Sequence, residues 1–180
     1  MTPVARRLNL GCGVDVRPGW VNLDGRALPG VDVVHDLARP LPFAAGTFDE
    51  VLCQDVLEHV DMVAVLGEVH RVTAPGALVH IRSPHFSGHL AHVDPTHVRG
   101  VSVATFDYFV SSGPGDDYYF DFAFTAVDRR RVVLPDRRAL PLNRPVERWV
   151  NKGARRQQLY EESFLCRLFP AMNVEVELVR

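Results

Sequence analysis

The chain has 180 residues, the size of one ordinary domain that can bury a core of its own. Apolar residues make up 47% and charged residues 23%, as in globular domains, and no run of 18 apolar residues is present, so we expect no membrane span. The net charge is −2, with 8 basic against 15 acidic side chains in residues 1–125 and 12 against 7 in residues 126–180. Because no aromatic-interleaved basic motif accompanies the basic part, a nucleic-acid partner is not expected.

The first half of the chain alternates short apolar runs with turn signals, which predicts βαβ units and a mainly parallel sheet. The expected strands are RLNL (7–10), WVNLD (20–24), VDVVH (31–35), FDEVLCQ (48–54) and ALVHIRS (77–83). Between the last two strands, Val60 to Val72 places valine and leucine at helical spacing. Ala74-Pro75-Gly76 is then expected to end this helix and turn the chain into the next strand.

The remainder of the chain predicts one short helix, two strands and a helical region. VATFDYFV, after Ser102, is typical of a short helix with that serine as its N-cap. FDFAFTAVDRRRVVL (120–134) predicts one long strand, and residues 143–169 are helical in composition with an interruption near Gly153. NVEVELVR (173–180) alternates strictly, as an edge or antiparallel strand does.

The N-terminus and the cysteines predict the cellular compartment. The first strand-like run begins within six residues of Met1, which leaves no room for a signal peptide. Cys12, Cys53 and Cys166 are odd in number and form no CxxC pair, which indicates reduced thiols. We therefore expect a cytoplasmic protein.

The first strand runs directly into Gly11-Cys12-Gly13, a turn that lets backbone N–H groups approach a ligand closely. The nicotinamide fingerprint requires a third glycine at position 16 and an acidic residue about twenty residues further on. Position 16 is Val16, and the next strand ends at Asp24, only eleven residues past Gly13. Dinucleotide binding is therefore the poorer interpretation.

Four stretches follow one another in order: LNLGCG, GWVNLD, HDLARPLPFAAGTFDEVLCQDVLEHV and LGEVHRVTAPGALVHI. Together they resemble the class I S-adenosylmethionine-dependent methyltransferases, and look closest to the short bacterial methyltransferase-domain proteins of the methyltransferase-11 type. The resemblance covers about residues 7–110. It implies an α/β, Rossmann-like sheet of about seven strands, parallel with one antiparallel strand near the C-terminus, and S-adenosylmethionine as cofactor.

The resemblance also implies which residues hold the cofactor. The glycines of the first turn would line its amino-acid end, Asp24 would bind both ribose hydroxyls, and Gln54 with Asp55 would face its methionine end and the substrate. Many relatives carry an acidic residue two positions before the first glycine, where this chain has Asn9, an amide that brings no charge toward the sulfonium. The implied cofactor-binding set is Leu10, Gly11, Cys12, Gly13, Asp24, Asp36, Leu37, Gln54 and Asp55.

PHFSGHLAHVDPTHVRG (84–100) holds four of the eight histidines and would leave the fifth strand across the mouth of the acceptor pocket. Three roles stay open for it. His85 or His97 could act as general base. A divalent metal could bind His89, His92, Asp94 and His97, although their spacing matches no established ligand signature. The loop could instead be structural, with Asp94 capping the Asp-Pro-Thr turn and His97 bonded to a backbone carbonyl.

From these observations we expect a single methyltransferase domain over residues 1–180. Residues 7–83 would form the cofactor-binding half, and residues 84–180 the acceptor lid, the C-terminal helix and the closing strands. The expected reaction is methyl transfer from S-adenosylmethionine to an oxygen or nitrogen of a small-molecule acceptor, with His85 and His97 as catalytic residues and no assigned metal. A metal-assisted methyltransferase and a non-catalytic S-adenosylmethionine-binding scaffold are the alternatives, and a homodimer through the basic C-terminal helix is a further prediction.

Overall fold

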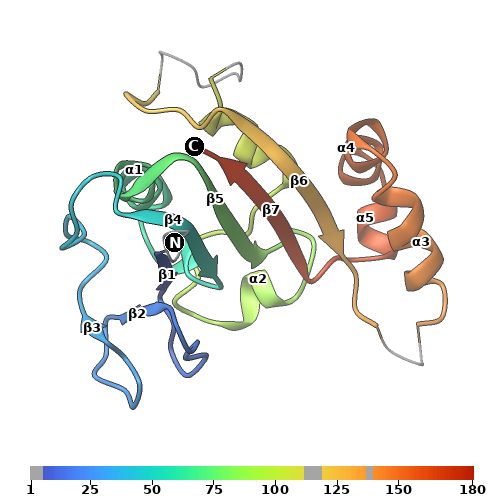
Figure 1. The fold of residues 1–180 in the computed structure, drawn as a ribbon. Coiled ribbons are helices and arrows are strands. Elements are labelled where there is room, and N and C mark those ends of the chain that lie inside the picture. The colour runs from blue at the N-terminus through green and yellow to red at the C-terminus, as the bar shows by residue number, and fades with distance from the viewer. Residues whose placement is uncertain (1–5, 112–118, 137–139) are drawn as a thin grey trace.

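A seven-stranded sheet of order β3-β2-β1-β4-β5-β7-β6 forms the centre of the computed structural model, which describes residues 6–111, 119–136 and 140–180 (Figure 1). Its strands are β1 (Arg7–Leu10), β2 (Val21–Asp24), β3 (Val33–Val34), β4 (Phe48–Gln54), β5 (Thr73–Pro84), β6 (Ala126–Val133) and β7 (Asn173–Val179). β1 to β5 are mutually parallel, and β7 lies between β5 and β6, antiparallel to both. The predicted Rossmann-like sheet with one reversed strand near the C-terminus is thereby confirmed.

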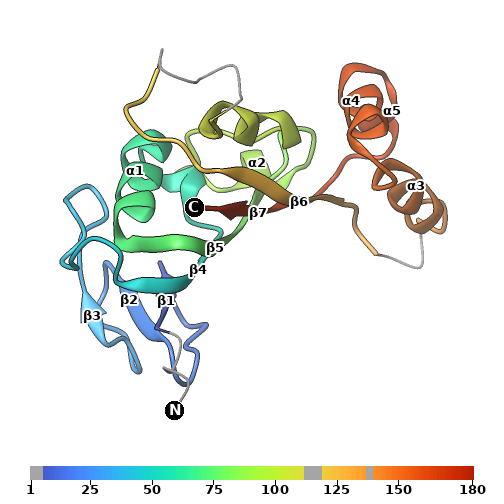
Figure 2. The same cartoon turned by 45° about the horizontal axis from the view of Figure 1, so that its top comes forward.

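The helices divide between one face of the sheet and its β6 edge. They are α1 (Met62–Val72), α2 (Leu90–Val93), α3 (Asn143–Val150), α4 (Ala154–Glu162) and α5 (Leu165–Leu168), with 3-10 helices η1 (Leu57–His59) and η2 (Val103–Phe109). α1, α2 and η2 lie on the same side of the sheet, and α3 to α5 lie beyond β6 (Figure 2). Among the described residues, no helix reaches the length and hydropathy that a membrane span requires.

Local capping fixes where two of these helices begin. The Asp61 side chain accepts hydrogen bonds from the backbone N–H groups of Val63 and Ala64 at the start of α1. Ser102 caps η2 in a capping box with Thr105, which confirms the predicted N-cap. α1 then turns one apolar stripe to the sheet, burying Leu66, Val69 and their helical neighbours.

The starts of two predicted strands differ from the structure by four residues or more. β5 begins at Thr73, directly after α1, so Ala74-Pro75-Gly76 forms the start of the strand; Gly76 has a φ of 80°, and its N–H bonds the carbonyl of Arg180. The strand predicted over 120–134 begins at Ala126, and before it only an isolated bridge joins Phe124 to Val110 among the described residues. Its first residues instead pack as aromatic rings, with Phe120 stacked on Phe109 at a centroid distance of 4.8 Å.

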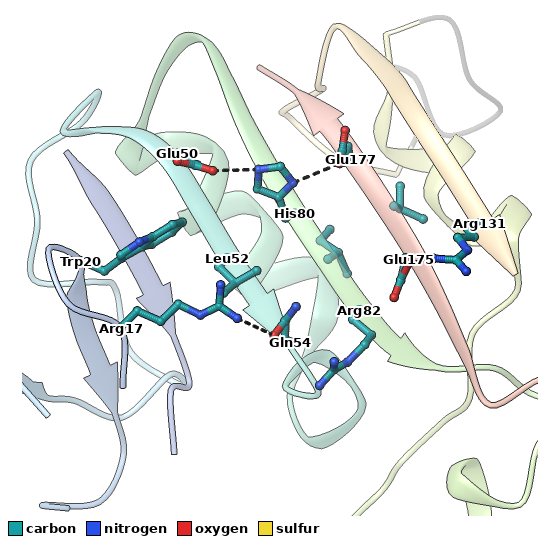
Figure 3. Close-up of a pocket in the computed structure, with 12 residues that line it drawn as sticks. Arg17, Trp20, Glu50, Leu52, Gln54, His80, Arg82, Arg131, Glu175 and Glu177 are labelled. Atoms are coloured by element: carbon teal, nitrogen blue, oxygen red, sulfur yellow. Dashed lines mark hydrogen bonds and ion pairs between the residues drawn. The ribbon is translucent and has the colours of Figure 1, made fainter. Parts of the chain in front are cut away.

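No helix of the described residues covers the other face of the sheet, which is in view in Figure 1. The connections after β1, β2 and β3 are turns and bends without helix. β7 buries every second residue, and the alternate positions facing away from the core carry Glu175 and Glu177. β5 places His80 and Arg82 on the same open face (Figure 3). Polar side chains at these positions allow one face of the sheet to meet water.

Two buried asparagines hold the turn that replaces the usual first helix. The Asn9 amide donates to the carbonyl of Asp15 at 2.7 Å and to Oδ1 of Asn22 at 3.1 Å. Oδ1 of Asn22 also accepts from the backbone N–H of Arg17 at 2.8 Å, and its amide donates to the carbonyls of Arg17 and Trp20. Both asparagines are only 3% exposed, so this network fixes residues 11–20 from inside the fold.

We expect Asn9→Asp to lower the free energy of unfolding by about 1–3 kcal/mol, because the carbonyl of Asp15 and Oδ1 of Asn22 then lose a buried donor. Urea unfolding followed by tryptophan fluorescence measures this change. The control is Val14→Ala in the same turn, where the side chain is 92% exposed and the expected change is below about 0.5 kcal/mol. An unchanged stability in Asn9→Asp would contradict the role given to this network.

Candidate functional site

The carboxyl ends of the first strands meet around one hollow, and five residues of the implied cofactor set line it. In open parallel sheets this edge is where ligands bind. Four further residues complete its wall: Gly25, Val56, His59 and Val60. The five predicted residues that the structure brings together here are Gly11, Asp24, Asp36, Leu37 and Asp55.

Gly11 lies in close contact with the turn after β4. Its φ is 64°, and a Cβ atom placed on it would lie 2.4 Å from a methyl carbon of Val56. A side chain at this position would therefore push the two turns apart. The glycine allows the ends of β1 and β4 to form one wall of the hollow.

Asp24, at the end of β2, is held by two backbone donors. Its Oδ2 accepts from the N–H of Gly13 at 2.8 Å, and its Oδ1 accepts from the N–H of Arg26 at 2.9 Å. A carboxylate has about four acceptor positions, so both oxygens keep capacity for a ligand's hydroxyl groups. Asp36 is fixed similarly, with Oδ1 accepting from the N–H of Ala38 at 2.9 Å.

Asp55 follows β4 and has a φ of 54°. Among the described residues, no other residue except glycine has a positive φ. Its N–H donates to the carbonyl of Arg82, and its carboxylate pairs with the guanidinium of the same arginine. Such backbone conformations cost about 1–3 kcal/mol and occur preferentially at functional sites. The pairing with Arg82 also raises the pKa of that guanidinium, although burial acts against it.

The other predicted cofactor residues do not line this hollow. Gln54 lies on the open face of the sheet, in a second hollow with Arg17, Trp20 and His80 (Figure 3). Its Oε1 accepts from Arg17 at 3.4 Å. The side chains of Leu10 and Cys12 are buried in the core, so these two residues offer a ligand only their backbone.

His85 is fully buried in a hydrogen-bond network away from the Asp24 hollow. The N–H of Ser87 donates to its Nδ1 at 3.1 Å, so Nδ1 is the acceptor and Nε2 carries the proton. Nε2 donates to Oε1 of Glu161 at 3.0 Å. The same carboxylate accepts from Ser102 Oγ at 2.7 Å and from the N–H of Val103 at 2.8 Å. This arrangement favours a structural role for His85, since both ring nitrogens are used.

The turn expected from Asp-Pro-Thr is present. Asp94 Oδ1 accepts from the backbone N–H of Thr96 at 2.8 Å, and His97 Nδ1 contacts the carbonyl of Leu90 at 2.8 Å. Both bonds are those that the structural interpretation of this stretch predicts. His89 and His92 are exposed and border another hollow, beside Met172.

His97 lies with two residues that the sequence did not single out as ligands, Glu58 and His59. One side-chain ligand atom of each lies within 4.8 Å of the others, and no other such group of three occurs among the described residues. Burial raises the pKa of Glu58, against hydrogen bonds from its own backbone and from Ser83 that lower it. His59 is exposed and lines the Asp24 hollow. In the sequence, the sign of this group was the pair Glu58-His59 between the apolar residues Leu57 and Val60.

Comparisons with known proteins agree with this fold. A family model described as "methyltransferase domain" matches residues 2–81. The chain is similar to an S-adenosylmethionine-dependent methyltransferase from Archaeoglobus fulgidus, with a TM-score of 0.64, 16% identity, and 98% of this chain and 86% of that one covered. It is also similar to an S-adenosylmethionine-dependent methyltransferase from Mesorhizobium loti. The TM-score is 0.56 and the sequence identity 18%, with 98% of this chain and 91% of that one covered.

A third solved structure, coclaurine N-methyltransferase bound to N-methylheliamine and SAH, has a TM-score of 0.54 and 12% identity, with 100% of this chain and 67% of that one covered. At these identities the likeness is one of fold. A search of curated proteins found no match.

We expect stability to fall at acid pH through Glu161. Burial raises the pKa of Glu161, but the hydrogen bonds from His85, Val103 and Ser102 outweigh it, so the pKa lies below its ordinary value. The stabilisation that the ionised Glu161 carboxylate provides is therefore complete above the pKa of an unfolded glutamate, about 4.3. It is lost as the pH falls through the lower pKa that Glu161 has in the folded chain. Urea midpoints between about pH 6 and 3 measure it.

The Glu161→Gln variant should show a shallower acid decline than the parent chain. Glu162→Gln, an exposed neighbour on α4, is the matched control and should keep the parent profile. Equal profiles for all three proteins would argue against a stabilising Glu161 carboxylate.

Proposed function

We propose that the chain is a class I S-adenosylmethionine-dependent methyltransferase, as the matching family model over residues 2–81 and the fold neighbours support. We further propose that it transfers the methyl group of this cofactor to an oxygen or nitrogen of a small-molecule acceptor. The observation that carries the proposal is the hollow at the carboxyl ends of β1, β2 and β4, where Asp24 is held ready to accept hydrogen bonds. This edge is the expected ligand position of an open α/β sheet.

The residues of the hollow fit an adenosine-bearing cofactor. The oxygens of Asp24 keep free acceptor capacity for two vicinal hydroxyls, and Leu37 gives an apolar wall for a base. Gly11 brings backbone rather than a side chain to the inner end. In our proposal Asp24 binds the ribose, Asp36 and Leu37 border the adenine, and Gly11 with Asp55 lies at the methionine end.

The charge of the hollow suits the cofactor's reactive group. Bound S-adenosylmethionine supplies a methyl group that its positive sulfonium has already activated. The carboxylates of Asp24, Asp36 and Asp55 surround the hollow with negative potential, of which Arg82 neutralises part at Asp55. The chain's remaining task is to orient a nucleophile in line with that methyl group, which can supply much of the rate.

A small-molecule acceptor is supported by the fold neighbour that holds N-methylheliamine, an amine of small size. We assign His85 a structural role, because it reaches Glu161 rather than the hollow. General-base action of His97 stays a prediction, as do the homodimer, for which light scattering is the test, and the cytoplasmic location.

We expect Asp24→Asn to weaken binding of S-adenosylmethionine and of S-adenosylhomocysteine by about ten- to a hundredfold, since a charged hydrogen-bond acceptor contributes about 1.5–3 kcal/mol. Isothermal titration calorimetry with each compound measures this. Asp121→Asn, at an exposed carboxylate outside the hollow, is the control and should bind as the parent chain does. Unchanged binding in Asp24→Asn would remove the ribose assignment.

The acceptor class is tested with S-adenosylmethionine labelled in its methyl group. We expect the purified chain, incubated with a metabolite extract, to move label into the small-molecule fraction, and the lability of the labelled bond to base distinguishes an ester from an ether or an amine. Label found only in protein or nucleic acid would overturn the small-molecule acceptor. Binding of the cofactor without any label transfer in the presence of every fraction would favour the scaffold alternative.

A further inference from the structure

Three hydrogen-bond acceptors converge at the junction of η1 and the 94–98 turn without a donor between them. They come from Glu58 and His59 of η1 and from His97 of the turn, with one ligand atom of each within 4.8 Å of the others. The two imidazole rings lie 4.5 Å apart between centroids, at 70° to one another. The N–H of Val98 donates to the carbonyl of Glu58 at 2.8 Å, which fixes the turn against η1.

The tautomer of His97 follows from its partner. Nδ1 lies 2.8 Å from the carbonyl oxygen of Leu90, and a carbonyl can only accept. In the neutral ring Nδ1 therefore carries the proton, and Nε2, which lies 4.0 Å from Oδ2 of Asp94, presents a lone pair. The side chain of His97 is only 9% exposed, so this lone pair is largely removed from water.

The tautomer of His59 follows from a chain of two hydrogen bonds. Thr96 Oγ1 donates to Oδ1 of Asp94 at 2.6 Å, because the carboxylate can only accept. The hydroxyl oxygen is then the acceptor for His59 Nδ1, 2.8 Å away. Nε2 of His59 is thus also left with a lone pair.

Glu58 completes the set from inside the fold. Its side chain is fully buried, and Oε2 accepts from Ser83 Oγ at 2.9 Å. Oε1 has no hydrogen-bond partner among the described residues. A buried carboxylate oxygen without a partner is costly, and two imidazole lone pairs nearby cannot satisfy it.

We propose that Glu58, His59 and His97 bind a divalent transition-metal ion of the Zn²⁺ type. Two imidazole nitrogens and one carboxylate oxygen form a three-ligand set that leaves a further coordination position open. Metal-bound histidines generally donate their second N–H to a carbonyl or a carboxylate-linked group, as His97 does to Leu90 and His59 does to Thr96.

The proposed ligand set differs from the metal alternative that the sequence left open. It keeps His97 and has Glu58 and His59 in place of His89, His92 and Asp94. Glu58 and His59 precede His97 by 39 and 38 positions in the sequence but lie beside it in the structure. His59 also lines the hollow with Asp24 and Asp36, so the ion would border the proposed cofactor pocket. The inference concerns metal binding alone and does not depend on the acceptor.

The test is a Zn²⁺ titration of the full chain, purified without an affinity tag and freed of metal by a chelator, in competition with a chromogenic chelator. We expect about one Zn²⁺ per chain, with affinity reduced at least about tenfold in His97→Ala and in Glu58→Gln. His92→Ala, an exposed histidine of the same loop, is the matched control and should bind as the parent chain does. Co²⁺ substitution adds a second measurement, since loss of an imidazole changes its visible absorption.

Because Glu58 is buried, its variant could fail to fold, so circular dichroism accompanies each titration. His59→Ala changes an exposed side chain and keeps the test decisive, with the same expected loss of affinity. Equal Zn²⁺ affinity in the parent, His59→Ala and His97→Ala would overturn the proposal. So would a loss of binding in His92→Ala alone, or no stoichiometric binding by the parent. Calorimetry with S-adenosylmethionine is a separate measurement, so failure here leaves the proposed function untouched.

Discussion

The hydrogen bonds of Asn9 and Asn22 are the constraint on which the ligand edge of this sheet depends. In a doubly wound fold a helix usually follows the first strand and holds the glycine turn, but here only ten residues separate β1 from β2. The turn must therefore be fixed by side chains. An amide at position 9 can donate to a carbonyl and to Asn22 at once. An acidic side chain cannot donate when ionised, so an amide at position 9 has a structural reason.

The short connections between the first strands also determine what each face of the sheet contacts. Turns instead of helices follow β1, β2 and β3, so one face meets water and carries polar side chains at alternate positions. Among them, His80 contacts Glu50 at 3.1 Å and Glu177 at 3.4 Å, in a row across three strands (Figure 3). The apolar face packs against α1, α2 and η2 (Figure 2). The turn after β1 and the turn after β4 contact each other directly through Gly11 and Val56, and this contact holds the wall of the hollow in place.

Local sequence was sufficient for much of this structure. The strand periodicity, the N-cap at Ser102 and the turn at Asp94 depend on neighbours within a few residues, and all are present. The family resemblance implied that Asp24, Asp36 and Asp55 would line one site, and all three border the same hollow. What the sequence could not show is pairing over long separations: His85 meets Glu161 across 76 positions, and His97 meets Glu58 across 39. The loop is rich in histidine, but the surroundings of His85 and His97 are set by the distant glutamates Glu161 and Glu58.

The histidine-rich loop is attached at both ends, and this bears on how it can serve the site. At its start, His85 ties the end of β5 to Glu161 of α4. Near its end, Val98, Thr96 and His97 contact η1 or the loop's own helix α2 through separate hydrogen bonds. A segment held at both ends by buried or backbone-anchored bonds is better suited to form a fixed wall than to open and close. Since His59 belongs both to this attachment and to the Asp24 hollow, the loop's histidines influence the ligand edge by holding its wall in place.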